Sequence, residues 1–279
     1  MHLVTLVEDT KGREDLKNRF GLSLYLETGG RSLLFDTGQD GTFLENARTL
    51  GVDMADLDLA VLSHGHYDHG GGLGAFFTAT EAVPLFLRTG AGGPHYARLL
   101  WMNKYIGLDE AVLDQNRERL RWVENNTELA PGIDALTAMK RTEPLPTGNR
   151  RLFVKTQGGF VRDPFTHELT CVVREKDGMV VLAGCGHSGI LNMVMAAKDS
   201  FPGVPVKAVV GGFHLIDNPL LKTMGATPEE VREVARKLRS LGCQRVITGH
   251  CTGWKAARIL KNELGDRLEI LHTGYEADV

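Results

Sequence analysis

The sequence of 279 residues has few cysteines, little net charge and no long apolar run. Four cysteines are too few and too scattered for a disulfide framework, which excludes the class of small disulfide-rich secreted domains. A formal net charge of -3 gives no electrostatic basis for binding nucleic acid. No apolar stretch reaches the length that crosses a membrane, and the amino terminus lacks a basic region followed by a long apolar run. We therefore expect a cytoplasmic protein with neither nucleic acid nor membrane as its partner.

The pattern of apolar residues predicts an α/β fold. Its hydrophobic content of 42% is ordinary for a globular protein. The first half is mixed and includes a predicted hairpin that turns at Gly29-Gly30 and a helix over residues 43–50. The second half alternates strands and helices, and one helix begins with a capping box at residues 227–230. This order predicts two sheets with helices outside them, and we expect residues 1–279 to form a single domain.

Residues 90–146 differ in character from the rest of the chain. We expect helices over residues 95–105 and 109–120, followed by a tract that is punctuated by prolines. The stretch is too short to build a core of its own. We interpret it as a helical insertion that covers the functional site, and the alternative is a plain connecting layer.

The segment 63–72 contains three histidines and one aspartate within six residues, directly after an apolar run. Imidazole and carboxylate groups together suit zinc, iron or manganese. His64 and His66 are two apart, so in an extended segment they point the same way. Asp68 and His69 follow after the chain has turned and can serve a second ion. The pattern predicts one or two divalent transition-metal ions, with zinc as the first choice and iron or manganese as alternatives.

A second loop, residues 183–189, also leaves an apolar strand and enters a helix. Its glycines let the backbone approach an ion closely. We expect His187 to be the third ligand of the first metal, and the alternative is a capping or supporting histidine. Cys185 can bind zinc or iron as a thiolate, but a small buried thiol also explains it.

Two later loops carry further candidates. His214 follows two glycines at a strand exit, so it is a candidate metal ligand or substrate contact; the alternative is an ordinary buried histidine. In the loop 248–253, Thr252 and the amides from Gly253 onward can bind an anion, because a helix start presents unpaired N–H groups and a partial positive charge. A plain N-cap is the alternative role for Thr252.

Taken together, the H-x-H-x-D-H segment and these loops resemble the signature of the metallo-β-lactamase superfamily. The resemblance implies a four-layer αββα sandwich with a one- or two-metal site along the open edge between its sheets. It also implies that Asp36 supports the metal loop without coordinating, and that His250 is the last ligand. We therefore assign His64, His66 and His187 to one ion and Asp68, His69 and His250 to the other. Asp68 is also the candidate general base.

The sequence departs from the superfamily at Cys185, where the family usually presents an aspartate that bridges the two metals. The family's third histidine also tends to lie upstream of this strand. The histidine in that tract is His167, whose neighbours suggest a strand entrance. His95 lies outside these loops, and nothing in the pattern requires it at the site.

The loops Gly-Cys-Gly-His-Ser-Gly-Ile, Gly-Gly-Phe-His-Leu and Gly-His-Cys-Thr-Gly narrow the resemblance to one branch of the superfamily. That branch is often labelled 7,8-dihydropterin-6-yl-methyl-4-(β-D-ribofuranosyl)aminobenzene 5'-phosphate synthase, or simply metal-dependent hydrolase. The resemblance implies an enzyme that acts on a phosphorylated small molecule, by the synthase-like reaction or by phosphoester hydrolysis. The alternative is a non-hydrolytic iron-binding redox or sensor protein on the same fold.

Overall fold

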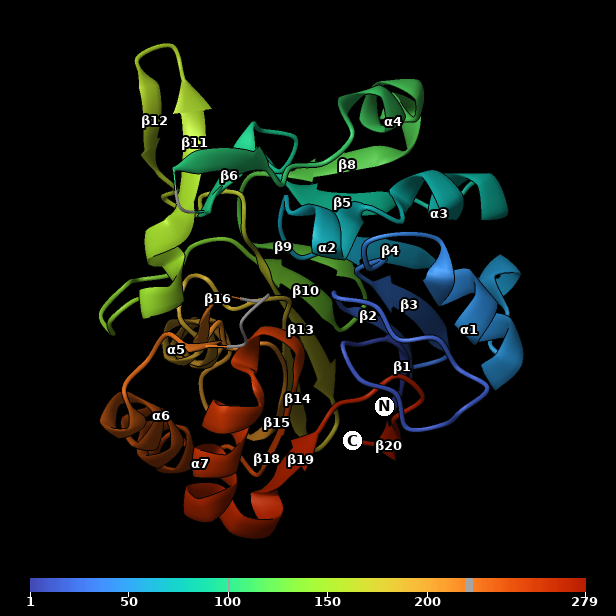
Figure 1. Cartoon of the computed structure of the whole chain (residues 1–279). Helices are drawn as coiled ribbons and strands as arrows, with labels where there is room; N and C mark the ends of the chain where they lie inside the picture. The colour runs from blue at the N-terminus through green and yellow to red at the C-terminus, as the bar shows by residue number, and fades with distance from the viewer. Residues whose placement is uncertain (100, 219–222) are drawn as a thin grey trace. The chain divides into compact units, whose positions relative to one another are not determined.

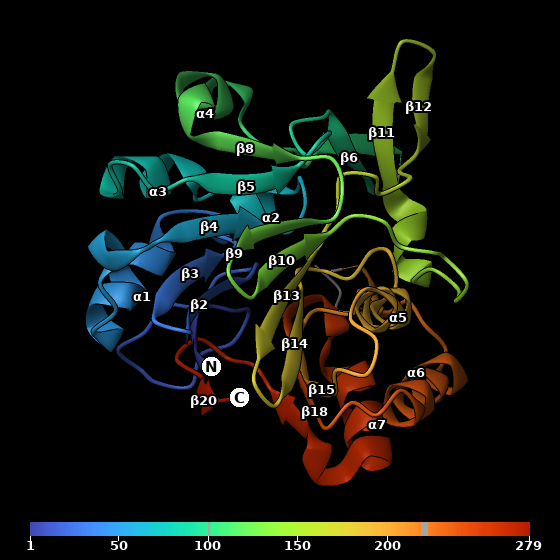
Figure 2. The same cartoon turned by 180° about the vertical axis from the view of Figure 1, so that it is seen from behind.

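The computed structural model describes residues 1–99, 101–218 and 223–279, which fall into two compact units. The first unit comprises Met1–Glu124, Arg151–Leu169 and His272–Asp278, and the second comprises Asn125–Arg150, Thr170–Leu271 and Val279. Each unit contains a seven-stranded sheet with its own helices (Figures 1 and 2). In the described part of the chain, no helix is both long enough and apolar enough to cross a membrane.

The large sheet of the first unit has the strand order β20-β1-β2-β3-β4-β5-β8. Strands β3, β4, β5 and β8 are parallel neighbours, whereas β1 pairs antiparallel with β2 and with β20 and β2 pairs antiparallel with β3. Its strands are β1 (His2–Val7), β2 (Ser23–Thr28), β3 (Arg31–Phe35), β4 (Leu59–Leu62), β5 (Leu85–Arg88), β8 (Leu120–Val123) and β20 (Glu276–Asp278). A second sheet of this unit comprises β12 (Gly159–Arg162), β11 (Leu152–Thr156), β6 (His95–Leu99) and β7 (Met102–Tyr105) in that order.

The helices of the first unit are α1 (Thr42–Leu50), α2 (Tyr67–Gly70), α3 (Leu73–Ala79) and α4 (Glu110–Gln115). Phe43 of α1 and Phe76 of α3 share one buried apolar cluster with Leu34 and Leu62 of the large sheet. The predicted hairpin between β2 and β3 is confirmed, since both Gly29 and Gly30 adopt the positive φ that a tight hairpin turn requires.

The large sheet of the second unit has the order β19-β18-β15-β14-β13-β10-β9. Its strands are β9 (Thr127–Ala130), β10 (Ile133–Leu136), β13 (Thr170–Glu175), β14 (Gly178–Ala183), β15 (Val206–Gly211), β18 (Arg245–Thr248) and β19 (Leu268–Ile270). A two-stranded sheet pairs β16 (Ile216–Asn218) with β17 (Thr223–Met224). In the large sheet β14, β15 and β18 are parallel, and their last residues Ala183, Gly211 and Thr248 are aligned. The three loops that follow these strands therefore start at the same edge of the sheet.

The helices of the second unit are α5 (Ile190–Ser200), α6 (Pro228–Ser240) and α7 (Trp254–Leu264). Met193, Val231 and Leu260, one from each helix, belong to a buried cluster that also contains Val246 of β18. The predicted capping box of α6 is confirmed: the Thr227 hydroxyl accepts from the Glu230 amide, and the Glu230 carboxylate accepts from the Thr227 amide.

The helices expected within residues 90–146 are largely wrong. The described residues of 95–105 form strands β6 and β7, because β6 pairs with β11, a partner far away in the sequence that local spacing does not reveal. The helix expected over 109–120 is shorter: α4 ends at Gln115, and Leu120 already begins β8. The stretch is therefore not a helical insertion, since β8, β9 and β10 are members of the large sheets. The extent of the single domain stays a prediction.

Candidate metal centre

The parallel pairing of β3 with β4 places Asp36 beside the start of the histidine segment. Asp36 follows β3, Ser63 follows β4, and the two strands are in register. The Asp36 carboxylate accepts hydrogen bonds from the Ser63 amide at 2.7 Å and from the Ser63 hydroxyl at 2.7 Å. It also accepts from Nδ1 of His69 at 2.6 Å. Asp36 thus supports the loop, as the sequence resemblance implied.

These hydrogen bonds fix the tautomers of two predicted ligands. His69 donates from Nδ1 to Asp36, so its Nε2 bears the lone pair. The Ser63 hydroxyl donates to Asp36 and therefore accepts from Nδ1 of His64, 2.9 Å away. His64 consequently also carries its lone pair on Nε2. A histidine whose second ring nitrogen donates to a carboxylate or hydroxyl is oriented as metal ligands in proteins usually are.

The four predicted ligands of this segment are buried close together within the first unit. The ring centroid of His64 lies 4.6 Å from that of His66 and 4.3 Å from that of His69. Oδ2 of Asp68 lies 3.7 Å from Nε2 of His69. Glycines after the segment allow this packing, since a Cβ at Gly72 would lie 2.5 Å from the carbonyl oxygen of Thr37.

A second histidine cluster in the same unit supports the segment from the side of His66. Nδ1 of His167 accepts from the Gly65 amide at 3.0 Å, and its Nε2 donates to Oδ2 of Asp163 at 3.2 Å. Nδ1 of His95 lies 3.1 Å from the same carboxylate oxygen. Because both ring nitrogens of His167 bind protein groups, this arrangement positions Gly65 between the two histidines of the H-x-H motif.

The electrostatics of this cluster favour neutral histidine and charged aspartate. Burial, together with His167 and His95, holds the pKa of His66 well below its ordinary value, although Asp68 and Asp163 oppose this. Burial likewise lowers the pKa of His167. For Asp163 burial acts upward, but the hydrogen bonds from His167 and His95 outweigh it and hold the pKa far below its usual range. A neutral His66 is the form that binds a metal.

Sequence reasoning missed Asp163 and gave His95 no role. Asp163 precedes a proline and carries no local motif, so its partners appear only when the chain folds. The amide of Phe165 also donates to Asp163 at 2.7 Å, and Phe165 adopts a positive φ. Such a conformation is uncommon for a bulky residue, which indicates that the turn around Asp163 is held by its surroundings.

In the second unit, His187 is oriented in the same way as His64 and His69, through a hydrogen bond from Nδ1. Nδ1 of His187 donates to Oδ1 of Asn149 at 2.9 Å, and Nδ2 of Asn149 donates to the carbonyl oxygen of His187 at 2.8 Å. His187 therefore carries its lone pair on Nε2, as His64 and His69 do. Asn149 was not predicted, because it lies in a 3₁₀ turn over Thr147–Arg151 with no recognisable motif.

The remaining candidates of this unit gather around Cys185. Sγ of Cys185 lies 3.4 Å from Nε2 of His250, and the ring centroids of His187 and His214 are 4.2 Å apart. His214 and His250 both adopt positive φ values, 47° and 48°. Residues other than glycine rarely do so, and such conformations concentrate at functional sites.

Cys251, the neighbour of His250, was not among the predicted site residues. It is buried, and its Sγ accepts from the His214 amide at 3.3 Å. Burial raises the pKa of its thiol, but Cys185, His250 and His214 outweigh burial and bring that pKa well below its ordinary value. Cys171 and Cys243 are buried as expected, at 0% and 1% exposure.

The anion-binding role expected for Thr252 finds no support in its contacts. The Thr248 hydroxyl donates to the carbonyl oxygen of Gly211, so the Thr252 hydroxyl donates to Thr248, 2.6 Å away, and accepts from the Phe213 amide. The Thr252 side chain is thus a buried structural link between loops. It is not the N-cap of α7 either, because that position is Gly253. Gly253 adopts a positive φ and packs so tightly against Ile216 that any side chain would collide with it.

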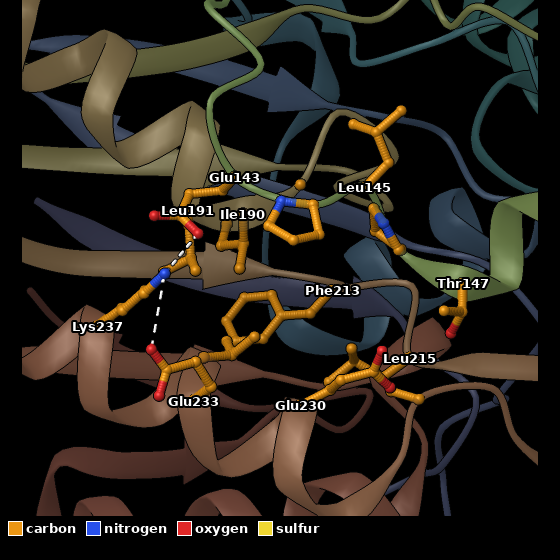
Figure 3. A pocket seen from close by; sticks show the side chains of 15 residues that line it. Glu143, Leu145, Thr147, Ile190, Leu191, Phe213, Leu215, Glu230, Glu233 and Lys237 are labelled. Atoms are coloured by element: carbon orange, nitrogen blue, oxygen red, sulfur yellow. Dashed lines mark hydrogen bonds and ion pairs between the residues drawn. The ribbon is translucent and has the colours of Figure 1, made fainter.

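A pocket of the second unit lies beside the loop that carries His214 (Figure 3). Its cavity volume is about 160 Å³. Phe213 and Leu215, the two neighbours of His214, form part of its apolar wall together with Ile190 and Leu191. At the rim, Lys237 forms ion pairs with Glu143 at 2.7 Å and with Glu233 at 3.6 Å.

Comparison with known proteins identifies the class. The family model of the metallo-β-lactamase superfamily matches residues 16–190. A crystal structure described as a metal-dependent hydrolase of the β-lactamase superfamily has a TM-score of 0.84 and 31% identity, covering 100% of this chain and 99% of that chain. The chain therefore belongs to the metallo-β-lactamase superfamily of metal-dependent enzymes. The predicted α/β fold class of this type is confirmed.

Within the superfamily, one similar protein carries a specific name. It is the 7,8-dihydropterin-6-methyl-4-(β-D-ribofuranosyl)-aminobenzene-5'-phosphate synthase of Methanocaldococcus jannaschii, with 30% identity over 98% of this chain and 94% of its own length. The predicted resemblance to that branch is thus confirmed. Zn²⁺-bound PqqB from Methylobacterium extorquens, at 13% identity and a TM-score of 0.62 with 100% of both chains covered, shares the fold alone.

The donor groups fit a divalent transition metal. Imidazole nitrogens oriented through the second ring nitrogen, one carboxylate and buried thiols are the ligand types of zinc and iron. Within the first unit they come from a single segment, and within the second unit from three loops at one sheet edge.

Proposed function

We propose that this protein is a metal-dependent enzyme that acts on a phosphorylated small molecule with an aromatic part. The support is the superfamily membership together with the name of the Methanocaldococcus jannaschii relative, a synthase whose product combines a dihydropterin with a ribofuranosylaminobenzene 5'-phosphate. A bound divalent ion supplies the positive charge that polarises a phosphoryl oxygen.

One observation carries the proposal: His64, His69 and His187 each donate from Nδ1 to a protein acceptor. Orienting three buried imidazoles in this way restricts their side chains and requires Ser63, Asp36 and Asn149 as partners. An arrangement of this kind is expected when the opposite nitrogens must be held in place for a cation. The ligand assignment made from the sequence, with His64, His66 and His187 on one ion and Asp68, His69 and His250 on the other, stays a prediction.

Asp68 has two possible roles in this proposal, metal ligand and general base. As a base it would take a proton from the attacking group, and as a ligand it would hold the ion. The variant Asp68→Asn separates the roles: loss of metal indicates a ligand, whereas retained metal with lost turnover indicates a base.

The pocket beside His214 is the proposed site for an apolar ring of the substrate. A cavity of about 160 Å³ is comparable to those that accept a single six-membered ring. Its walls are apolar, and its rim carries the ion pairs of Lys237. Binding of the ring there would place the rest of the molecule next to the His214 loop.

The test begins with the metal content of the purified and reconstituted protein, followed by two assays. In the first, the metal-loaded protein receives a dihydropterin-methyl diphosphate donor and ribofuranosylaminobenzene 5'-phosphate, and diphosphate release is measured. In the second, phosphoesters are screened for phosphate release. A chain without metal after reconstitution, or a metal-loaded chain inactive in both assays, would overturn the proposal.

A second candidate function is that of a non-hydrolytic iron-binding redox or sensor protein. The observation that favours it is the contact of Cys185 with His250, because thiolate and imidazole are both ligands of iron. The same measurements separate the two functions. Iron retained through purification, with a reversible redox change and no turnover in either assay, favours the second.

A further inference from the structure

Two cysteines of the second unit, from different loops, converge on one histidine. Sγ of Cys185, Sγ of Cys251 and a ring nitrogen of His214 all lie within 4.8 Å of one another. Cys185 follows β14, His214 follows β15 and Cys251 follows β18, the three parallel neighbours whose ends are aligned. The convergence is therefore a product of the sheet topology.

The ligand atoms of the cluster lie close enough together to share a single ion. In a tetrahedral zinc site with ordinary bond lengths, a sulfur and a nitrogen ligand are separated by about 3.5 Å. The two sulfurs and the ring nitrogen of His214 lie within 4.8 Å of one another, so small side-chain adjustments would bring them to this separation. The amide of His214 donates to Cys251 Sγ at 3.3 Å, a contact that stabilises a metal-bound sulfur.

Packing and backbone conformation at the cluster agree with a dedicated site. Gly212 lies against Cys251 so closely that a Cβ there would collide with the Cys251 sulfur. The ring nitrogen Nδ1 of His214 is buried and has no hydrogen-bond partner among the described residues. A buried nitrogen without a partner is unfavourable unless a ligand compensates it. The positive φ of His214 shows that the backbone accepts strain to hold this side chain.

We propose that Cys185, Cys251 and His214 bind one cation of borderline softness, zinc or ferrous iron, through two thiolates and one imidazole. The inference rests on the proposed metal dependence and adds a separate ion, since its three ligands belong to neither of the two sets assigned above. Each thiol releases its proton to solvent as its sulfur–metal bond forms. Hard ions such as magnesium, which prefer oxygen ligands, are excluded from such a site.

Cobalt(II) reports thiolate ligation directly, because thiolate-to-cobalt charge transfer absorbs strongly in the near ultraviolet. The metal-stripped protein, kept reduced with a phosphine, is titrated with cobalt and its absorption and bound cobalt are measured. The wild type should show the band. Cys185→Ser and Cys251→Ser should each lose about half of its intensity per bound cobalt, and His214→Ala should weaken cobalt binding about 10- to 100-fold.

Cys171→Ser and Cys243→Ser are matched controls, because both cysteines are buried in the same unit but lie outside the cluster. Both should keep the full band. The inference is overturned if the wild type binds cobalt without the band, or if the band survives intact in both Cys185→Ser and Cys251→Ser. Cobalt bound without the band leaves the metal dependence standing, whereas failure to bind any ion overturns both proposals.

A measurement on the wild-type protein tests the inference even if the variants do not fold. X-ray absorption of wild-type protein saturated with zinc should require sulfur in the first coordination shell. A shell of nitrogen and oxygen alone would overturn the inference without any substitution.

Discussion

Nδ1 of His69 donates to Oδ2 of Asp36 over 2.6 Å, and neither side chain is exposed. Asp36 has a positive φ of 62° and sits at the end of β3, parallel to the strand that leads into the histidine segment. One carboxylate thereby orients His69 directly and His64 through Ser63. The orientation of His64 and His69 therefore depends on Asp36, which is not itself a predicted metal ligand.

Replacing Asp36 should therefore weaken metal binding. Asp36→Asn is the suitable change, because asparagine tolerates a positive φ but cannot accept from His69 and from both Ser63 groups as a carboxylate does. We expect metal affinity to fall about 10- to 100-fold. Zinc titration against a competing chelator measures it. Asp134→Asn, a buried aspartate that pairs with Arg174 away from the histidines, is the control, and equal affinities in the two variants would contradict the prediction.

Asn149 should matter for metal binding through the tautomer of His187. Asn149→Leu removes the acceptor for Nδ1, so the histidine can rotate or carry its proton on Nε2, and affinity should fall about tenfold or more. Asn149→Asp restores an acceptor and should recover most of the loss. Chelator competition measures both variants. The prediction is contradicted if Asn149→Leu binds zinc with wild-type affinity. If the zinc affinity of Asn149→Asp is no higher than that of Asn149→Leu, Asn149 acts through packing and not as a hydrogen-bond acceptor for His187.

Asp163 should stabilise the fold in a pH-dependent way. Its pKa is held far below the usual range, so the stabilisation is complete above the pKa of an unfolded aspartate, about 4, and is lost as pH falls from there towards the folded pKa. At pH 7 Asp163→Asn should destabilise by about 1–3 kcal/mol, since hydrogen bonds to a charged acceptor are replaced.

Denaturant unfolding of wild type and Asp163→Asn between about pH 3 and pH 7 tests this prediction. The difference in unfolding free energy should shrink below about pH 4. A difference that stays constant or grows there would show that the charge of Asp163 is not what stabilises this cluster.

Filling the pocket beside His214 should weaken substrate binding. Ala226 lines the pocket and is 7% exposed, so Ala226→Leu places three more carbons in or beside the cavity. With the substrate found in the proposed assays, KM should rise about tenfold while kcat changes little, because one ring contact is worth on the order of 1–3 kcal/mol. Ala111→Leu in α4 of the first unit is the control. An unchanged KM would place the ring elsewhere.

The sequence predicted most elements whose signals are local. The turn at Gly29-Gly30, the capping box at Thr227 and the strand ends before His64 and His187 depend on residues a few positions apart. Periodicity and turn chemistry are encoded at that range, so they can be recognised without the fold. The helix expected over 95–105 failed for the opposite reason, since pairing of β6 with β11 decided its conformation.

By itself, the sequence identified the side chains that are of metal-ligand type and predicted that they follow strand ends, because the H-x-H-x-D-H spacing and the glycine-flanked loops can be recognised from consecutive residues. Tertiary structure decided which groups orient them. Asn149 meets His187 across 38 positions, and Asp163 meets His95 across 68. Cys251 meets Cys185 across 66. Such contacts form only when strands pair in a particular register, and register is a property of the whole sheet, which no short stretch of sequence specifies.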